Sequence, residues 1–538
     1  MEDQNWSCLG DRARLHPDRP LIINGTTGDT LTYAEVDQRS NRLAHYLYSL
    51  GLRPGDHIAM VLENNIRCME IGWAALRAGL LLTAVNRFLT PDEAAYIIAD
   101  SGSKAVISSL AMRELAESLS TRMPGCPIRL MADGTIDGWQ SYEDAVARFP
   151  ATPLPDERLG ALMLYSSGTT GQPKGILRAP HSDKVHEYLD PFRKKQFAGW
   201  GFFEGMVYLS TAPLYHSAPL GWVLQMGAVG ATVVYMEKFD AEKALALVQQ
   251  YRVSHSQWVA TMFVRMLKLP EATRKAYDLS SLRCATHSAA PCPVDVKLAM
   301  IDWWGPIIHE YYGATEGNGM TMIDTADYLA HPGSVGRAVV GIPHICDDDG
   351  NELPPGQSGL IYFERDRQPF HYHNDPEKTE SARHPRHPNW TAVGDVGYLD
   401  QDGYLYLTDR KTFMIISGGV NIYPQAIEDA LVTHPKVGDA AVIGVPDAEM
   451  GESVKAIIEP AEGVAPSAEL AEELIGYLRG KVARYMIPKS VDFIERMPRL
   501  QTGKLYKQEL RKRYWEAAGK SVEAPLTKSL ETTCSTKT

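Results

Sequence analysis

The chain has 538 residues, of which 44% are hydrophobic and 22% are charged. This is the composition of an ordinary globular protein, and the length exceeds what one hydrophobic core usually supports, so we expect two or more domains. The formal net charge of −12 argues against a protein that wraps nucleic acid, although a local basic patch could still bind a small anion.

The first residues and the cysteines favour a cytoplasmic protein. The start, MEDQNWSCLGD, lacks the basic and apolar regions of a signal peptide. The most apolar window, from Gly72 to Val85, is too short to span a bilayer and contains Arg77. The seven cysteines include no CxxC pair, which argues against a zinc site or a disulfide framework and indicates a reducing compartment.

Helical and extended patterns alternate in the first part of the chain. Thr32 precedes Glu35 by three residues, which is the spacing of a capping box, and apolar residues then recur at helical intervals up to Leu47. The next segment, HIAMVLEN, is a short apolar run that predicts a strand, and it is followed by the helical pattern MEIGWAALRAG and the strand-like KAVISSL. Similar units recur near MVYLSTAP and ATVVYM. This alternation predicts parallel sheets with helices on both faces, which is an α/β fold.

The pattern changes twice further along the chain. After about Gly333, short strands joined by turn dipeptides predict a small all-β region, and after Arg410 a compact stretch with its own helices and strands predicts a separate α+β domain. We therefore expect an N-terminal domain over residues 1–409, a C-terminal domain over residues 410–515, and a disordered tail over residues 516–538, which lacks periodic apolar positions.

The segment YSSGTTGQPKG, from Tyr165 to Gly175, gathers glycines and hydroxyl side chains around Lys174. The bare backbone N–H groups of such a loop can converge on phosphate oxygens, so it predicts a phosphate-binding loop, with a flexible surface loop as the alternative. It is not a Walker A motif, because Lys174 follows Pro173 and precedes Gly175 and because both flanking segments look extended.

Further motifs follow this loop in order along the chain. They are PLYHSAP, YYGATEG, GDVGYLDQDGYLYLTDRK, SGGVNIYP and QTGK. With these motifs, the chain from about residue 10 to 513 resembles the adenylate-forming superfamily of acyl-CoA synthetases, peptide-synthetase adenylation domains and firefly-type luciferases, and it looks most like bacterial acyl-CoA synthetases. The resemblance implies an N-terminal domain of two doubly wound α/β subdomains plus a small β-barrel, followed by a small mobile α+β C-terminal domain.

Members of this superfamily activate a carboxylate with ATP and then pass the acyl group to a nucleophile. Because a carboxylate and a triphosphate repel each other, cations must lie where negative charge gathers. The resemblance implies that Lys504 bridges the acid and the α-phosphate, that Thr315 lies near that phosphate, and that His216 orients the carboxylate. It also implies that Glu316 holds Mg²⁺, an ion that prefers one or two carboxylates together with phosphate oxygens.

The same resemblance assigns the remaining nucleotide and acceptor contacts. Asp395 and Arg410 would bind the ribose hydroxyls as an acceptor and a donor. The adenine would be framed by Tyr312 with Ser288, Ala289 and Ala290. The β- and γ-phosphates would be held by Ser166, Ser167, Gly168, Thr169, Thr170, Gly171 and Lys174. The pantetheine arm of CoA would be flanked by Gly418 and Gly419.

The acid is expected to lie among ring-bearing and polar side chains. The residues that we expect there are Trp222, Gln257, Trp258, His287, Tyr311, Gly313 and Met320. Plain core packing is an equal alternative for the side chains among them. Their mix of aromatic and polar groups favours a ring-bearing or medium-length acid.

Four positions depart from the pattern of the superfamily. Thr412 stands where relatives carry the Asp or Lys on which the small domain turns, and Val420 replaces a Glu in the SGGEN loop. Val393 replaces the first residue of a TGD motif, and Met486 stands where many CoA-using relatives have a lysine. None of these removes a group that adenylation requires, so the departures leave the second half-reaction open.

We therefore expect an ATP-dependent carboxylic acid ligase that forms an acyl adenylate and then an acyl-CoA thioester. Its partners would be ATP, Mg²⁺, CoA and a small-molecule acid, with no nucleic acid and no membrane span, and the chain would act as a monomer or homodimer. The main alternative passes the acyl group to an amine or amino acid without CoA. The joint presence of Lys504, Glu316, Asp395 and Arg410 disfavours a non-catalytic nucleotide-binding protein, and nothing argues specifically for a luciferase-type oxygenase.

Overall fold

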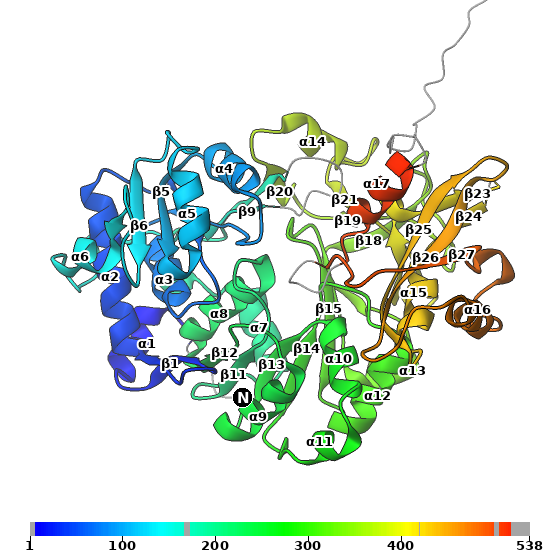
Figure 1. Ribbon diagram of the computed structural model, residues 1–538. Helices are drawn as coiled ribbons and strands as arrows, with labels where there is room; N and C mark the ends of the chain where they lie inside the picture. The colour runs from blue at the N-terminus through cyan, green and yellow to red at the C-terminus, as the bar shows by residue number, and fades with distance from the viewer. Residues whose placement is uncertain (1–5, 166–172, 419, 500–504, 518–538) are drawn as a thin grey trace, which may run out of the picture.

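The computed structural model describes residues 6–165, 173–418, 420–499 and 505–517 (Figure 1). Two α/β units, an all-β region and a smaller α+β unit follow one another along the chain, from the blue end of the ribbon to the red one. None of the helices in these ranges has the length and apolar character needed to cross a bilayer.

The first α/β unit is built on a six-stranded sheet with the order β7-β6-β5-β3-β4-β8, in which all neighbours are parallel. Its strands are β3 (His57–Val61), β4 (Leu81–Ala84), β5 (Ser103–Ser109), β6 (Ile128–Ala132), β7 (Gln140–Ser141) and β8 (Ala161–Leu162). Its helices are α2 (Tyr33–Ser49), α3 (Arg67–Arg77), α4 (Pro91–Asp100), α5 (Arg113–Ser120) and α6 (Tyr142–Ala147). Ile58 and Met60 pack with α2 and α3, whereas Ala59 and Val61 pack with α4 and α5, so helices cover both faces as predicted.

The second α/β unit is a nine-stranded sheet with the order β17-β16-β15-β14-β13-β11-β12-β1-β2. The central strands are parallel: β1 (Pro20–Asn24), β11 (Val207–Ser210), β12 (Thr232–Tyr235), β13 (His255–Trp258), β14 (Cys284–His287) and β15 (Ile308–Gly313). The antiparallel outer strands are β2 (Thr30–Thr32), β16 (Met320–Ile323) and β17 (Arg337–Val340).

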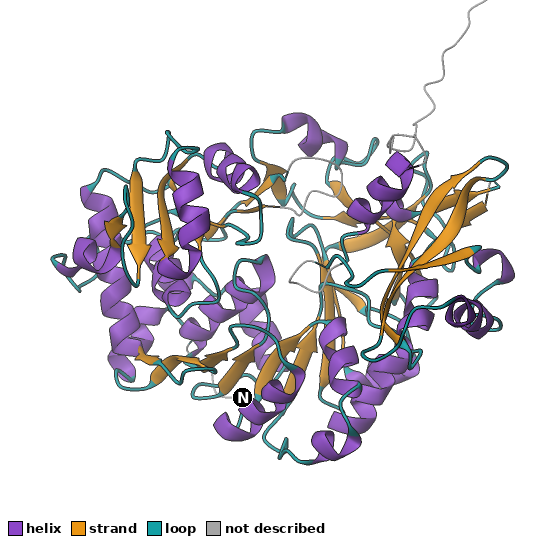
Figure 2. Ribbon diagram, viewed as in Figure 1, coloured by secondary structure: helices purple, strands orange, loops and turns teal. Residues whose placement is uncertain are grey.

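Helices cover both faces of this second sheet as well (Figure 2). One face packs with α1 (Leu9–Leu15), α7 (Pro191–Gly199) and α8 (Ser217–Val229). The other face packs with α9 (Ala241–Tyr251), α10 (Ala260–Leu267) and α12 (Val294–Trp304). The short helices α11 (Glu271–Lys275) and α13 (Thr325–Ala330) complete the unit.

The all-β region contains a four-stranded antiparallel sheet of β18 (Ile342–Cys346), β19 (Gly359–Glu364), β21 (Trp390–Leu399) and β22 (Leu405–Arg410). Beside it, an antiparallel sheet joins β9 (Leu164–Tyr165), β10 (Gly175–Arg178) and β20 (Phe370–Tyr372), and α14 (Pro376–Ser381) follows β20. This small sheet brings the two flanks of the glycine-rich loop together with the all-β region.

The last unit is an α+β layer. Its strands are β23 (Ile415–Ser417), β24 (Val420–Ile422), β25 (Val437–Asp447), β26 (Gly451–Pro460) and β27 (Ser490–Phe493). Its helices are α15 (Gln425–Val432), α16 (Ala468–Tyr477) and α17 (Lys507–Ala517). Of the tail expected from residue 516, the first two residues complete α17 and the remainder lies outside the described residues.

The joint between the all-β region and the last unit is held by side chains of α17. Arg511 donates from Nη1 to the carbonyl oxygen of Thr412 over 3.3 Å. The Nζ atom of Lys507 lies 2.8 Å from a carboxylate oxygen of Glu428 and 3.9 Å from one of Asp409. The joint is thus tied to α17 by charged groups that are largely withdrawn from water.

A second contact, away from this joint, links the second α/β unit to the last unit. Lys268 follows α10, and its Nζ donates to the backbone carbonyl oxygens of Val437 over 2.6 Å and Gly438 over 3.3 Å. Burial lowers the pKa of Lys268. Because both acceptors belong to the backbone, the contact depends on the position of β25 and not on the side chains of that strand.

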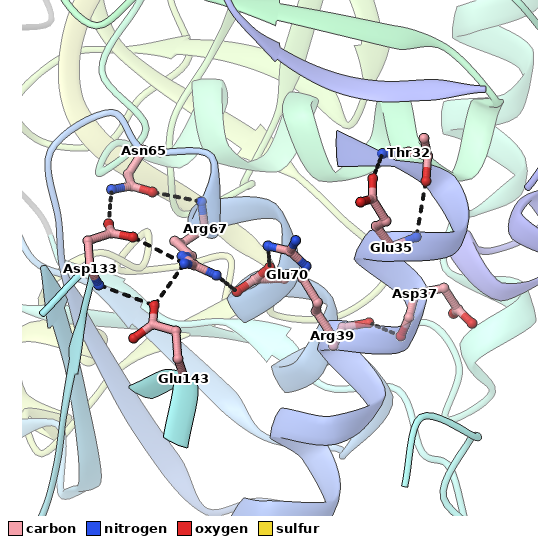
Figure 3. Close-up of polar contacts among 10 residues, drawn as sticks. Thr32, Glu35, Asp37, Arg39, Asn65, Arg67, Glu70, Asp133 and Glu143 are labelled. Atoms are coloured by element: carbon pink, nitrogen blue, oxygen red, sulfur yellow. Dashed lines mark hydrogen bonds and ion pairs between the residues drawn. The ribbon is translucent and has the colours of Figure 1, made fainter. Parts of the chain in front are cut away.

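The predicted capping box is present at the start of α2, where Thr32 Oγ1 accepts from the Glu35 N–H and Glu35 accepts from the Thr32 N–H (Figure 3). Such a reciprocal pair satisfies two backbone donors that a helix end leaves without partners.

An ion-pair network around one buried carboxylate lies nearby and centres on α3 (Figure 3). Arg67 is paired with Glu70 at 3.2 Å, with Asp133 at 3.1 Å and with Glu143 at 2.7 Å. The carboxylate of Glu70 is fully buried, and its other cationic neighbour, Arg39, lies 3.8 Å away. One guanidinium thus joins α3 to the end of β6 and to α6.

We predict that Arg67→Met lowers the free energy of unfolding of the first α/β unit by about 3 kcal/mol, because it leaves the buried Glu70 carboxylate poorly compensated. Urea unfolding followed by circular dichroism measures the shift. Arg122→Met is the matched control, since Arg122 pairs with Asp92 at the surface and should matter little. The double variant Arg67→Met/Glu70→Met should recover most of the loss, and a double variant as unstable as the single one would contradict the explanation.

Candidate active site

Three of the residues expected to bind the nucleotide form one polar cluster. Tyr312, near the end of β15, donates from Oη to Asp395 Oδ2 over 2.7 Å. Arg410, the last residue of β22, lies with its Nε 3.0 Å from Asp395 Oδ1. Asp395 and Arg410 are opposite each other in the ladder of β21 and β22, so the strand register itself sets their separation.

The charges in this cluster reinforce one another. The Asp395 carboxylate raises the pKa of Arg410 more than any other cause. Burial, followed by the Asp395 charge, raises the pKa of Tyr312 well above its ordinary value, so the phenol stays a donor. Each Asp395 oxygen keeps a second lone pair, and a carboxylate in this arrangement can still accept bonds from a pair of hydroxyl groups.

Glu316 joins the same cluster from the turn after β15. Its side chain is buried, and its Oε1 accepts from Oη of Tyr372 in β20 over 2.9 Å. The negative charge of Glu316 also raises the pKa of Arg410. Tyr372 was not found by sequence reasoning, because no motif marks the segment HYH around it.

The residues expected around the adenine follow β14. Ser288 is buried, Ala290 is half-buried, and Ala289 between them is exposed with a φ of 74°. A residue with a side chain rarely adopts this left-handed backbone, and such outliers persist where the surrounding structure imposes them. Thr315 and Gly313 lie in and before the turn that carries Glu316, and both keep access to solvent.

Several expected residues of the phosphate and acceptor sites lie outside the described residues. They are Ser166, Ser167, Gly168, Thr169, Thr170, Gly171, Gly419 and Lys504. Their flanks are placed: Tyr165 pairs with Gly175 across β9 and β10. Gly418 has a φ of 58°, and its N–H donates to the Met450 carbonyl oxygen over 2.8 Å.

Lys174, at the edge of the phosphate loop, forms an ion pair with Asp375, with 2.6 Å between Nζ and Oδ2. The hydrogen bond to Asp375 is the main cause that raises the pKa of Lys174. Asp375 also caps α14 by accepting the Lys378 N–H. Sequence reasoning missed Asp375, which precedes a proline and reads as an ordinary helix cap.

The side chains expected around the acid do not all lie on one side of the sheet. Gln257 faces the α7 and α8 side, where its Nε2 donates to Oη of Tyr311 over 2.8 Å. Trp258, the next residue, packs among α9, α10 and α12 on the opposite side. His287 lies on that opposite side too, with its ring 5.4 Å from that of Phe263. The period of two along a strand explains the division, since adjacent residues point to opposite faces.

His287 belongs to a buried polar group behind the sheet. Its Nε2 lies 3.5 Å from Glu310 Oε2, which is also 2.6 Å from Lys297 Nζ. Burial lowers the pKa of His287 to about 4, so the ring is neutral. This group links α12 to β14 and β15 and is separated by the sheet from Tyr311.

The α7 and α8 side carries a set of aromatic rings around Trp222. Its ring centroid lies 5.9 Å from that of Tyr311, 5.8 Å from that of Trp200 and 6.2 Å from that of Tyr208. The half-buried Met320 packs against the same cluster. His216 immediately precedes α8, and its ring lies 4.4 Å from that of Tyr215. Trp222, Tyr311 and Met320 are thus brought together, whereas Trp258 and His287 are not brought to them.

Comparisons with known proteins place this arrangement in a family. The model of AMP-binding enzymes matches residues 9–368, and the model of the AMP-binding enzyme C-terminal domain matches residues 426–504. A feruloyl-CoA synthase from an Amycolatopsis species is 34% identical over 511 residues, which cover 94% of this chain and 97% of that protein.

Two solved structures extend the comparison. An ATP-bound RpMatB–BxBclM chimera is 30% identical, with a TM-score of 0.79 over 95% of this chain and 99% of that one. The amide bond synthetase McbA from Marinactinospora thermotolerans is 25% identical, with a TM-score of 0.78 over 94% of this chain and 99% of that one.

The chain therefore belongs to the family of AMP-binding enzymes. The expected adenylate-forming α/β fold is confirmed. The expected class of reaction, ATP-dependent ligation of an acid to a thiol through an acyl adenylate, is also confirmed, because several relatives are named as ligases or synthases of acyl-CoA.

We predict that Asp375→Asn lowers the KM for ATP. The amide can still cap α14 but no longer neutralises Lys174, so the lysine charge is available to phosphate, and a change of about threefold is expected for an ion pair near the surface. Steady-state pyrophosphate release at varied ATP measures it. Asp347→Asn, a half-buried carboxylate that likewise accepts backbone N–H groups in a turn, is the control. An unchanged or raised KM in Asp375→Asn would show that the pair does not compete with ATP.

Proposed function

We propose that this ligase activates a ring-bearing or medium-length carboxylic acid with ATP and transfers the acyl group to CoA. The observation that carries the proposal is the connected set of Tyr312, Asp395, Arg410 and Glu316, beside the aromatic side chains around Trp222. Within it, Asp395 and Arg410 would bind the ribose, and Tyr312 would lie against the adenine.

The charges of the site suit a magnesium–ATP complex. Among the described residues, no three His, Cys, Asp or Glu side chains gather closely enough to hold a metal ion by themselves. Mg²⁺ in nucleotide sites takes one or two carboxylates and completes its shell with phosphate oxygens and water, and Glu316 would supply such a carboxylate, oriented by Tyr372. Bound there, the ion would neutralise charge on the leaving pyrophosphate.

The first half-reaction forms a bond between an oxygen of the acid and the α-phosphorus of ATP, while the bond from that phosphorus to the pyrophosphate oxygen breaks. His216, at the start of α8, would orient the acid, and Lys504 would offset the charge that develops between acid and phosphate. Lys174 would leave Asp375 for the phosphates. In the second half-reaction the thiolate of CoA attacks the acyl carbon and AMP leaves.

CoA is the first candidate for the acyl acceptor. Gly418 has a left-handed backbone, and a Cβ added there would meet the terminal methyl group of Met450, so the backbone runs close to that side chain, which fits a narrow passage for a pantetheine arm. An amine acceptor is the second candidate, favoured by the likeness to the amide bond synthetase McbA and by Val420 and Met486 at positions where CoA-using relatives carry polar residues.

A screen of pyrophosphate release tests the proposal. Aliphatic, aromatic and keto acids are each assayed with and without CoA, and with amino acids as alternative acceptors. We expect acid-dependent release and a thioester product with CoA. Release without any thioester, together with an amide in the amino acid arm, would favour the second candidate. No release with any acid would refute the proposed function.

We predict that Lys504→Ala slows acid-dependent pyrophosphate release a hundredfold or more, which corresponds to about 3 kcal/mol of lost transition-state stabilisation. ATP binding, measured by calorimetry, should change little. Lys512→Ala, an exposed lysine of α17, is the matched control. Near-normal adenylate formation in Lys504→Ala would contradict the assigned role.

We also predict that Thr412→Pro slows acyl transfer more than adenylation. The proline fixes φ and removes an N–H at the joint, where a change of backbone angles would let the small domain turn. Single-turnover formation of the adenylate, followed by its consumption on addition of the acceptor, separates the two steps. Thr412→Ala keeps the backbone free and serves as control. An equal fall of both half-reactions would place the turning point elsewhere.

A further inference from the structure

A guanidinium group lies beside the aromatic side chains of the proposed acid site. Arg193 belongs to α7, whose first turn is capped by Asp190. The Cζ atom of Arg193 lies 6.0 Å from the ring centroid of Trp222 and 5.7 Å from that of Phe197. These distances are within the range in which a cation and an aromatic ring attract each other.

Gln196, to which Arg193 donates a hydrogen bond, contacts two methionines of β16. Nη1 of Arg193 donates to Oε1 of Gln196, and Nε2 of Gln196 in turn lies 3.3 Å from the sulfur of Met322 and 4.0 Å from that of Met320. Burial raises the pKa of the Tyr311 phenol, and the charge of Arg193 is among the causes that oppose this rise. Arg193 thus lies among the side chains proposed to surround the acid.

A second guanidinium lies between Arg193 and the nucleotide cluster. Arg178 ends β10, and its side chain lies over Gly317, where an added Cβ would be 3.0 Å from Arg178 Cδ. The charge of Arg193 disfavours the charged form of Arg178, and the charge of Glu316 favours it. The two arginines therefore extend from the aromatic rings to the carboxylate of Glu316.

Neither arginine is neutralised by a close carboxylate. Throughout the described part of the chain, no Asp or Glu oxygen lies within 4.0 Å of either guanidinium, although ion pairs of this kind are common elsewhere in the molecule. Arg193 is half-buried and Arg178 is exposed, so both guanidinium groups adjoin solvent while their positive charges repel each other, and an anion placed between them would offset that repulsion. Arginine is the side chain best suited to a planar carboxylate, which it can bind through two parallel hydrogen bonds.

We propose that Arg193, assisted by Arg178, binds a second anionic group of the acid substrate, so that the preferred substrates are acids with a second carboxylate or an equivalent anion. The inference rests on the proposed function. The body of the acid would lie against Trp222 and Tyr311, its second anion would meet Arg193, and its reacting carboxylate would point toward the nucleotide. Arg193 would then determine specificity without taking part in the transfer of the acyl group.

The test compares matched pairs of acids that differ by one carboxylate: butyrate with succinate, benzoate with terephthalate, and cinnamate with 4-carboxycinnamate. In at least one of the three pairs, the wild-type chain should show a kcat/KM for pyrophosphate release that is at least tenfold higher for the diacid than for the monoacid. Calorimetric titration of each acid in the presence of a non-hydrolysable ATP analogue should show the same preference in Kd.

Arg193→Met should remove that preference, with a loss of tenfold or more on the diacid and little change on the matched monoacid. Arg193→Lys should restore part of it, because the charge returns without the second hydrogen bond. Lys195→Met, which removes an exposed cation from the same helix, should leave both acids unchanged. The melting temperature of each variant shows whether it has folded.

The outcomes distinguish the role of Arg193 from the ligase function itself. Pyrophosphate release that is equal or faster with the monoacid in every pair would overturn the inference while leaving the ligase function intact. An equal loss on both members of a pair in Arg193→Met would also overturn it and would assign Arg193 to the reacting carboxylate or to structure. If no acid releases pyrophosphate, the ligase function fails, and the calorimetric preference for the diacid still decides the inference.

Discussion

The ion pair between Asp395 and Arg410 is the interaction on which most of the site depends. It is formed by two residues that face each other in the ladder of β21 and β22, so its geometry is set by the backbone and not by flexible side chains. Through Asp395 it reaches Tyr312 on the second α/β unit, and through Asp409, next to Arg410, it adjoins the joint with the last unit. Loss of either partner would leave a poorly compensated charge where three parts of the chain meet.

The other cations of the site differ in how they are compensated. Lys174 is held by Asp375, while Arg178 and Arg193 have no carboxylate at ion-pair distance among the described residues. A site that brings together several anions needs cations that can bind them. Lys174 and the two arginines would meet this need in different ways. A paired lysine must leave its partner, whereas an arginine with no carboxylate at ion-pair distance has no such bond to break before it binds an incoming anion.

Much of this could be predicted from the sequence, because the motifs lie at strand ends and turns whose geometry is local. The capping box at Thr32 and the alternation of strands and helices are of this kind. The contact of Tyr312 with Asp395 joins distant parts of the chain, and these residues were singled out only by the resemblance to a family. Gln257 and Trp258 could not both face the acid, and the period of two along a strand would have separated them. Tyr372 and Arg193 could not be found, since their contacts arise between segments distant in sequence and no motif marks them. Lys504 and the loop from Ser166 to Gly171 lie outside the described residues, so their roles stay predictions.

The contact of Lys268 with the backbone of β25 has a consequence for the rate of turnover. A single side chain holding two carbonyl oxygens stabilises one orientation of the small unit by an amount comparable to one or two hydrogen bonds, roughly 1–3 kcal/mol. If the small unit turns between the half-reactions, that free energy sets how long the enzyme stays in each orientation. A substitution at Lys268 would then change the rate of turnover, although Lys268 contacts neither the acid nor the nucleotide. The affinity for these two substrates would stay the same.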